Sequence, residues 1–519
     1  MKHSYFLLSA CLLFSTLNLN AQSFSRYAII PTGLPVDSVV KIAAHICPSE
    51  QQAAWQELEF TVFFHFGINT FAGLEWGKKD IKAGIFNPSE LDARQWIRTV
   101  KEAGARLAIL VAKHHDGFCN WPSKYTEYSV KNSPWRDGRG DLVKEVSEAC
   151  KEYGLKFGVY ISPWDIHSEY YGTDEYNTYF KNLLTEVLTQ YGEINEVWFD
   201  GACGEGPNGK KQVYDWTGYY QLVRKLQPKA VIAIMGPDVR WVGTESGYGR
   251  ESEWSVVPVP ASSLESIVAN QQQAAGSGIF LPPGDMVQQD LGSRDKIKDA
   301  AGLIWYPSEA DVSIRPGWFY HEKDDSLVKS PDKLADIWFS SVGRNSVLLL
   351  NVPPDKRGLI HETDVKSLRG MRAILDSAFH VNLAKGATII PANGNPNFKA
   401  ENMVDNKPGT YWTSKKGSNT ASFILELQKP SSFNCLSIQE NFRHGQRVES
   451  FLVEIPEGKT WKIIASGTTI GYKRLLRFPA VQNSSVRIRI TSSRDNPEIS
   501  EIGLYSLPDR LIPVVSEKK

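Results

Sequence analysis

The first 380 residues alternate between helix-like stretches and short apolar runs. Three helical segments, Ala93–Ala103, Asp141–Tyr153 and Tyr176–Tyr191, each end at a glycine, and an apolar run follows each glycine. A glycine at that place fits the left-handed position that closes many helices. Repetition of helix, glycine and strand predicts βα units and a parallel sheet.

Seven apolar runs have the character of buried strands. They are Glu59–Phe66, Leu107–Ala112, Leu155–Ile161, Ile194–Phe199, Val231–Met235, Leu303–Tyr306 and Val347–Asn351. An eighth is not evident, and residues 256–300 have the irregular pattern of an insertion. Residues 22–380 therefore predict an α/β domain of the (β/α)8-barrel type. A doubly wound open sheet is the alternative, but no GxGxxG motif follows any of the runs.

The pattern changes after Phe379. Residues 385–508 are rich in Ser, Thr and Asn, and their apolar positions alternate with polar ones in the short runs Ser422–Leu427, Ser450–Ile455 and Val486–Ile490. Alternation with period two, interrupted by turn residues, predicts a second, all-β domain built as an antiparallel sandwich.

The N-terminus indicates export. Residues 1–21 combine Lys2, an apolar stretch and small residues up to Ala21, as a secretory signal does, with cleavage expected after Ala21. The mature chain is then periplasmic or extracellular. Alternatively, Cys11 is lipidated and the protein is a surface lipoprotein. No apolar run reaches the ~20 residues that span a bilayer, so no mature transmembrane helix is expected.

Composition narrows the range of partners. Lys plus Arg and Asp plus Glu each number 58, so the formal net charge is +0, and nucleic acid is not an expected partner. Removal of residues 1–21 leaves five widely spaced cysteines without metal-binding spacing. These are expected to be mostly free, buried thiols, because a disulfide framework is unusual at this size.

Polar residues follow several of the apolar runs directly. Asp200 ends the run that begins at Ile194, His65 ends another, and His114 and His115 with Asp116 end a third. In a parallel barrel, residues at the C-terminal ends of strands point into the active-site mouth. The alternative for Asp200 is that it only caps the following turn.

A second carboxylate is expected near Asp200. Glu245, Glu251 and Glu253 all follow the next strand, and any of them could face Asp200 across one bond. Two such carboxyl groups are what glycoside hydrolysis requires, one to attack or activate water and one to protonate the leaving oxygen. A solvated loop position is the alternative for each glutamate.

The histidines and tryptophans fit a sugar better than a metal. His114 and His115 are adjacent, whereas metal ligands usually have one or three residues between them, so hydrogen bonds to hydroxyls suit them better. The aromatic residues Trp76, Trp121, Trp164 and Trp318 are expected in loops after strands, where they could stack on a sugar ring or simply pack in the core. No GxSxG, HExxH or phosphate-binding glycine motif is present.

The chain resembles the α-L-fucosidases of glycoside hydrolase family 29. The resemblance covers roughly residues 30–380, and the stretches that carry it are His65-Phe-Gly67, Glu75-Trp76, His114-His-Asp-Gly-Phe-Cys-Asn-Trp-Pro-Ser123, Trp198-Phe-Asp-Gly201 and Arg315-Pro-Gly-Trp-Phe-Tyr320. It implies an exo-acting, retaining fucosidase that acts on fucosylated oligosaccharides or glycoconjugates and needs no cofactor for catalysis.

The resemblance also implies roles for individual residues. Asp200 matches the nucleophile; His65, His114, His115, Glu75, Trp76 and Trp318 match residues that line the fucose pocket. Residues 238–245 and 250–254 resemble the subgroup that cleaves α1,3/1,4-linked branches of Lewis type. There the acid/base matches Glu245, with Glu251 and then Glu253 as alternatives.

The C-terminal segment resembles discoidin-like carbohydrate-binding modules. Ala400-Glu-Asn-Met-Val-Asp405, Thr410-Tyr-Trp412, Thr491-Ser-Ser-Arg494 and Ile499-Ser-Glu-Ile-Gly-Leu-Tyr505 carry this resemblance. It implies a structural calcium ion near Asp405, Thr410 and Glu501. Two other functions stay open from the sequence, namely a glycan-binding protein that has lost catalysis and an exo-glycosidase for another sugar.

Overall fold

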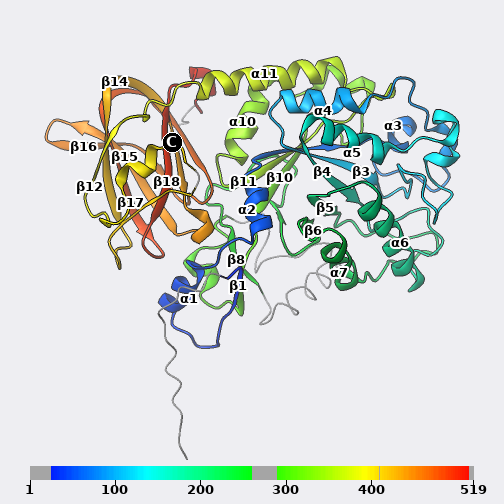
Figure 1. Cartoon of the computed structure of the whole chain (residues 1–519), viewed down its shortest axis with the longest axis horizontal. Coiled ribbons are helices and arrows are strands. Elements are labelled where there is room, and N and C mark those ends of the chain that lie inside the picture. The colour runs from blue at the N-terminus through cyan, green and yellow to red at the C-terminus, as the bar shows by residue number, and fades with distance from the viewer. Residues whose placement is uncertain (1–24, 260–288, 408, 514–519) are drawn as a thin grey trace, which may run out of the picture.

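The structure is a computed structural model that describes residues 25–259, 289–407 and 409–513. It consists of a helix-wrapped barrel and, beside it, an antiparallel sheet domain drawn in orange and red (Figure 1). The predicted signal peptide, Cys11 included, lies outside the described residues, as do residues 260–288 of the predicted insertion over residues 256–300.

Eight parallel strands form the barrel in the order β6-β5-β4-β3-β2-β11-β10-β7. Their bounds are β2 Phe60–Phe64, β3 Leu107–Lys113, β4 Lys156–Ile161, β5 Glu196–Phe199, β6 Val231–Ile234, β7 Arg240–Trp241, β10 Ser308–Ser313 and β11 Ser346–Asn351. A parallel bridge between Ala233 and Val239 links the two ends of the sheet, so the barrel is nearly closed. The predicted fold class is confirmed.

The strands are buried on both faces, which explains their continuous apolar runs. On β3, Leu107, Ile109 and Val111 belong to the core inside the barrel. Ala108 and Leu110, which alternate with them, belong to the core between the sheet and the surrounding helices. Every residue of β3 is buried, so the first polar side chains that can reach a ligand come where the strand ends.

The helices of this domain follow the strands as the pattern predicts. Their bounds are α1 Val36–Ala43, α2 Glu50–Gln56, α3 Ile68–Ala72, α4 Ala93–Glu102, α5 Leu142–Tyr153, α6 Glu175–Gln190, α7 Trp216–Leu226, α9 Arg294–Ile297, α10 Pro331–Ser341 and α11 Glu362–Phe379. Gly104, Gly154 and Gly192 have φ of 100°, 72° and 82°, so each adopts the left-handed conformation expected after α4, α5 and α6.

One predicted barrel strand was wrong and two were missed. The run Leu303–Tyr306 forms β9, Gly302–Trp305, which pairs with β1, Tyr27–Ile29, and β8, Val256–Val259, in a separate antiparallel sheet. The barrel uses β7 and β10 instead. The sequence of β10, Ser-Glu-Ala-Asp-Val-Ser, has polar residues at the positions that other strands fill with apolar ones. Its pattern therefore does not indicate a buried strand.

The C-terminal domain is a seven-stranded antiparallel sheet around its own hydrophobic core. Its strands are β12 Thr388–Pro391, β13 Trp412–Thr413, β14 Ala421–Glu440, β15 Val448–Glu457, β16 Thr460–Gly467, β17 Arg474–Ser493 and β18 Glu498–Tyr505. The three alternating runs predicted from the sequence are parts of β14, β15 and β17. The two longest strands, β14 and β17, pair along most of their length with register shifts at two places.

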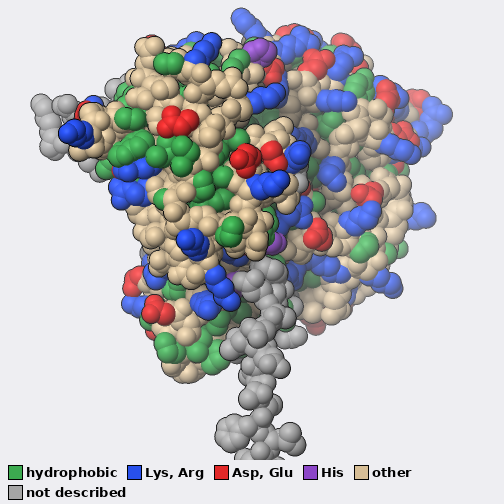
Figure 2. All heavy atoms as spheres, turned by 60° about the vertical axis from the view of Figure 1, so that its left-hand side comes forward, with side chains coloured by type: hydrophobic (Ala, Val, Ile, Leu, Met, Phe, Trp, Pro, Cys, Tyr) green, Lys and Arg blue, Asp and Glu red, His purple; other side chains and the backbone are tan. Residues whose placement is uncertain are grey.

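The distribution of surface charges and the state of the cysteines are as the composition predicts. Acidic and basic side chains are interspersed on the face shown in Figure 2. The five cysteines of the described residues are all free, and four of them are buried, as predicted. In the same part of the chain, no helix has the length and apolar character needed to cross a bilayer.

The C-terminal domain holds the base of the barrel through the loop between β16 and β17. Glu59, just before β2, has a φ of 62°, and its carboxylate accepts hydrogen bonds from Lys473 Nζ and from Tyr472 Oη, the latter at 2.8 Å. Asn345, just before β11, donates from its backbone to Lys473 O at 3.0 Å. The Tyr472 amide donates to Asn345 Oδ1 at 2.8 Å. Two barrel strands thus begin at residues that this loop anchors.

Gly471 lets the loop approach the barrel this closely. Its φ is 65°, and a Cβ atom there would lie 2.4 Å from the Asn345 side chain.

We expect Gly471→Ala to lower the melting temperature more than Gly458→Ala, since Gly458 has a φ of 62° but no atom within 4 Å of its would-be Cβ. Both changes carry the left-handed cost of about 1 kcal/mol, and only Gly471→Ala adds a steric clash. Equal melting temperatures would contradict a tight interface here.

Candidate active site

Asp200 lies at the C-terminal end of β5 with its carboxylate fixed by two hydrogen bonds. Tyr160 Oη donates to Oδ2 at 2.9 Å, and the Ala202 amide donates to Oδ1 at 2.7 Å. His115 Nε2 is 4.0 Å from Oδ2, and 24% of the side chain is accessible. The carboxylate is therefore held in one orientation while remaining open to a ligand in the barrel mouth.

His65 and His115 are each held by their Nδ1 atoms. The Asn351 amide donates from Nδ2 to Trp318 O at 2.8 Å, which leaves its Oδ1 to accept a hydrogen bond from His65 Nδ1 at 2.9 Å. Ser162 donates its hydroxyl proton to Trp164 O at 2.9 Å. Its oxygen therefore accepts from His115 Nδ1, 2.7 Å away. In both rings Nε2 is then the acceptor atom.

Burial keeps the three histidines neutral. It lowers the pKa of His65 and of His115 to about 4, and that of His114 well below its usual value. For His114, the proximity of the other two imidazoles lowers the pKa further. The ring of His114 stacks on Tyr160, and its centroid is 4.1 Å from that of His115. Three neutral imidazoles together offer hydrogen-bonding atoms to a polyhydroxylated ligand without adding charge.

Glu75 ties together the loop that follows β10. Its Oε2 accepts hydrogen bonds from the amides of Trp318 at 2.8 Å and Phe319 at 3.3 Å. Its Oε1 is 2.7 Å from His321 Nε2. The predicted pocket residue Glu75 thus acts on the loop backbone, and through it orients the predicted pocket residue Trp318.

Two further tryptophans stand beside His115. The ring of Trp76 is 5.5 Å from the His115 ring and 5.5 Å from that of Trp164. Trp164 lies 5.0 Å from His115 and donates from Nε1 to Glu205 O at 3.2 Å. Trp76 is 57% exposed, which is unusual for so large an apolar side chain. By contrast, Trp121 is buried in the core between strands and helices, the alternative that the sequence left open for it.

Of the three candidate acid/base residues, Glu245 is the one that adjoins these groups. Trp318 Nε1 donates to its Oε2 at 3.3 Å. Partial desolvation raises the pKa of Glu245, and the negative charges of Asp200 and Glu75 raise it further, against the opposing hydrogen bond from Trp318. A raised pKa favours the protonated form that a general acid needs.

Glu251 and Glu253 are instead committed to arginines. The Glu251 carboxylate pairs with Arg344 and, at 2.9 Å, with Arg474 Nη2. Glu253 is buried between Arg240 and Arg250. Although burial raises the pKa of Glu253, the two guanidinium groups outweigh it and lower the pKa overall. Both carboxylates are thus engaged by guanidinium groups.

Sequence reasoning missed several residues of the site. Asn351 ends β11 just as Asp200 follows β5, so the strand-end rule could have found it. Tyr160 lies within β4, where nothing separates it from an ordinary core aromatic. Asp311, inside the barrel on β10, accepts from Trp241 Nε1 at 2.7 Å. Burial raises the pKa of Asp311 to about 8, with added repulsion from Glu245 and Asp200.

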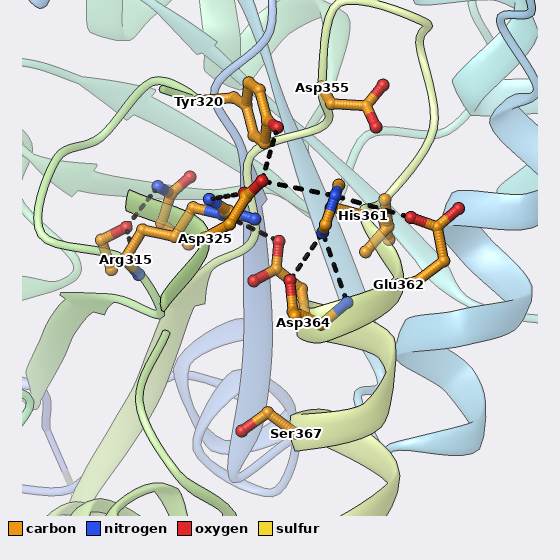
Figure 3. Close-up of polar contacts among 12 residues, drawn as sticks. Arg315, Tyr320, Asp325, Asp355, His361, Glu362, Asp364 and Ser367 are labelled. Carbon is orange, nitrogen blue, oxygen red and sulfur yellow. Dashed lines mark hydrogen bonds and ion pairs between the residues drawn. The ribbon is translucent and has the colours of Figure 1, made fainter. Parts of the chain in front are cut away.

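A buried ion-pair network pins the loop that carries Trp318 (Figure 3). Arg315 donates from Nε to Asp364 Oδ2 at 2.9 Å and from Nη1 to Asp325 Oδ1 at 2.8 Å. Its guanidinium also lies over the Tyr320 ring, 4.5 Å from the centroid. Asp364 belongs to the first turn of α11, so Arg315 fixes the loop to that helix. This gives the arginine of the sequence motif a structural role beside the tryptophan.

The predicted calcium ligands come together at the edge of the C-terminal domain. Thr410 Oγ1 donates to Asp405 Oδ1 at 3.0 Å, and the Asn406 amide donates to Glu501 Oε2 at 2.9 Å. Burial raises the pKa of Glu501 to about 7, and the Asp405 charge adds to this. The described residues contain no cluster of three or more His, Cys, Asp or Glu arranged for a metal. A cation here would therefore need backbone and hydroxyl oxygens as well.

Comparisons with known proteins cover both domains. Residues 44–377 match the alpha-L-fucosidase family, and residues 389–503 match the F5/8 type C domain. Alpha-L-fucosidase 1 of Arabidopsis thaliana is 40% identical over 95% of this chain and 92% of its own length.

Solved structures of related proteins have a similar fold. A crystallised Bacteroides ovatus homologue is 47% identical, with a TM-score of 0.82 over 95% of this chain and 80% of its own. A Ruminococcus gnavus family 29 fucosidase, solved in complex with fucose, is 31% identical, with a TM-score of 0.78 over 90% of this chain and 96% of its own.

A parallel barrel with two carboxyl groups and several aromatic rings at the strand ends defines the class as a glycoside hydrolase. The chain belongs to the α-L-fucosidase family, glycoside hydrolase family 29, and carries a C-terminal F5/8 type C domain. It is an enzyme of that family.

Proposed function

We propose that this enzyme is an exo-acting, retaining α-L-fucosidase that prefers α1,3/1,4-linked fucose on branched, Lewis-type glycans. The observation that carries the proposal is the contrast between two neighbouring carboxyl groups. Asp200 is fixed by Tyr160 and the Ala202 amide, whereas Glu245 lies where its pKa is raised. Family membership and the fucose complex of the Ruminococcus gnavus relative support fucose as the sugar.

The reaction has two steps. Asp200 forms a bond to the anomeric carbon while the glycosidic bond breaks, and protonated Glu245 gives its proton to the departing oxygen. Glu245 then removes a proton from water, the water oxygen bonds to the anomeric carbon, and the bond to Asp200 breaks. Two displacements restore the original anomeric configuration; they require carboxyl groups about 5–5.5 Å apart.

The neutral histidines would hold the sugar. With Nδ1 occupied, the Nε2 atoms of His65 and His115 accept hydrogen bonds from hydroxyl groups. His115 Nε2 lies 4.0 Å from Asp200 Oδ2, so a sugar hydroxyl that donates to it would lie beside the proposed nucleophile. Trp76 and Trp164 form an aromatic wall against which the apolar face of a sugar packs. Their exposure at the mouth also suits contact with the neighbouring sugar of a branch.

The linkage preference and the residue roles can be tested together. We expect wild-type protein to release fucose from a Lewis-type trisaccharide but not from α1,2-fucosylated lactose. Asp200→Ala and Glu245→Ala should each lower kcat/KM for the trisaccharide at least ~100-fold, since general acid catalysis and covalent catalysis each contribute that much or more. Chromatographic detection of free fucose is the measurement, with Glu152→Gln, an exposed surface change, as the control.

Other outcomes would point elsewhere. Full activity of Glu245→Ala would move the acid/base role to another residue. Equal release from both sugars would remove the linkage preference. Binding of the glycan without any fucose release would favour the glycan-binding alternative, and release of galactose in place of fucose would favour another exo-glycosidase.

We further propose that Asp405, Thr410 and Glu501 help hold a structural calcium ion. Two carboxylates close enough to raise one pKa, beside a hydroxyl, form an oxygen-rich site that suits Ca²⁺. We expect millimolar calcium to raise the melting temperature of EDTA-treated protein, because a ligand that binds the folded state stabilises it. Glu501→Gln should abolish that shift. An unchanged melting temperature in the wild type would contradict the proposal.

Export is also proposed. Residues 1–21 have the features of a secretory signal, and the enzyme would then meet fucosylated glycans in the periplasm or outside the cell. The intact mass of the exported protein distinguishes a chain that begins at Gln22 from one lipidated at Cys11.

A further inference from the structure

The C-terminal domain contacts the same segment that carries Glu245. This segment, residues 242–255, runs from the end of β7 to the start of β8. Near Glu245 its backbone is tied to the barrel, because the amides of Val242 and Gly247 donate to Glu309 O at 2.9 Å and to Asp311 O at 3.0 Å. The Glu245 carboxylate itself accepts only the long hydrogen bond from Trp318 among those resolved in the structure.

Arg474, the first residue of β17, holds the segment from the C-terminal domain. Its Nη1 donates to Glu251 O at 2.7 Å and its Nη2 to Glu251 Oε2 at 2.9 Å. Thr468 Oγ1 donates to the same carbonyl oxygen at 2.7 Å. The Arg474 side chain is almost fully buried, whereas the Glu251 carboxylate is exposed, so the arginine reaches the segment from inside the interface.

Arg477 reaches the segment by a second route. Its Nη2 donates to Asp336 Oδ1 at 2.9 Å, and Tyr248 Oη donates to Asp336 Oδ2, also at 2.9 Å. Arg477 also lies over the Phe339 ring, 4.8 Å from the centroid. One carboxylate on α10 thus links β17 to a residue three positions from Glu245.

The far end of the segment is held by the C-terminal domain as well. Gln446 accepts from the Ser255 amide at 2.7 Å and donates to Glu253 O at 2.9 Å. Arg494 lies over the Trp254 ring with its guanidinium carbon 3.5 Å from the centroid. The direct contacts of the segment with the C-terminal domain therefore run from Glu251 to Ser255, Tyr248 is linked only through Asp336, and no contact with that domain is resolved at Glu245.

We propose that Arg474 and Arg477 are positioning residues for the fucosidase reaction: they hold Tyr248 and Glu251 and so set where the Glu245 carboxyl stands. The C-terminal domain is then a working part of the catalytic unit as well as a module attached to it. This inference rests on the proposed acid/base role of Glu245. The two arginines would supply the positioning that an exposed carboxyl with one long hydrogen bond of its own lacks.

Two substrates separate a misplaced acid from general damage. A Lewis-type trisaccharide needs a proton on its leaving oxygen, whereas α-L-fucosyl fluoride releases fluoride without one. The value of kcat/KM reports the steps up to the first bond cleavage, so it isolates the acid role of Glu245 from its later role as base. We expect Arg474→Met and Arg477→Met to lower kcat/KM for the trisaccharide on the order of 10-fold, since small displacements of catalytic groups cost that much. For fucosyl fluoride, the change should stay under about 2-fold, because no proton transfer is lost.

Arg487→Met is the matched control. Arg487 also lies on β17 but pairs with Glu454 inside the C-terminal domain, so both kcat/KM values should match those of the wild type. Melting temperature and circular dichroism report folding of each variant. Thr468→Val, which removes one hydrogen bond and no charge, serves if Arg474→Met does not fold, with a smaller loss on the trisaccharide alone.

The outcomes for the two proposals differ. Suppose that Glu245→Ala selectively loses activity on the trisaccharide. If the arginine variants then lower kcat/KM equally for both substrates, or for neither, the positioning role is wrong while the acid role stands. If Glu245→Ala itself shows no selectivity between the substrates, the acid assignment is what fails.

Discussion

Burial of the barrel strands on both faces is the constraint on which the rest of the structure depends. A strand such as β3 has no exposed residue, so side chains that do chemistry find room only where the strands end. Asp200, His65, His115 and Asn351 all occupy such places, and parallel pairing brings their strand ends to one rim. Residues far apart in the chain become neighbours as a consequence of strand order alone.

The same burial sets the electrostatics of the site. Desolvation keeps the three histidines neutral, so they add hydrogen-bonding atoms without competing for the charge of Asp200. It also raises the pKa of Glu245 and, inside the barrel, of Asp311. Where a carboxylate must stay charged, as at Glu253, arginines surround it. The pKa values of Glu245 and Glu253 therefore shift in opposite directions, because desolvation and nearby carboxylates act on Glu245 while two guanidinium groups act on Glu253.

The C-terminal domain contacts the barrel at the starts of two strands and at the segment that carries Glu245. The loop between β16 and β17 anchors Glu59 and Asn345 at the base of β2 and β11, the strands that lead to His65 and Asn351. A few residues later, β17 reaches the segment that carries Glu245. A module that served only as a tether would not need to bury an arginine such as Arg474 in this interface. The interface instead joins the C-terminal domain to the starts of β2 and β11 and to the segment that carries Glu245.

The sequence by itself determined the βα repeats, the strand-end polar residues and the all-β second domain, because each produces a local periodicity or a contiguous motif. It did not reveal β10, since that strand turns Glu309 and Asp311 inward, toward the indoles of Trp198 and Trp241, and so lacks an apolar pattern. It ranked Glu245 ahead of Glu251 and Glu253 only through a family resemblance, and it did not show how the surroundings of the three carboxyl groups differ. That distinction depends on which charges surround each carboxyl, and those charges come from residues up to 223 positions away, as Arg474 is from Glu251. Only the tertiary structure, which brings such residues together, shows these different surroundings.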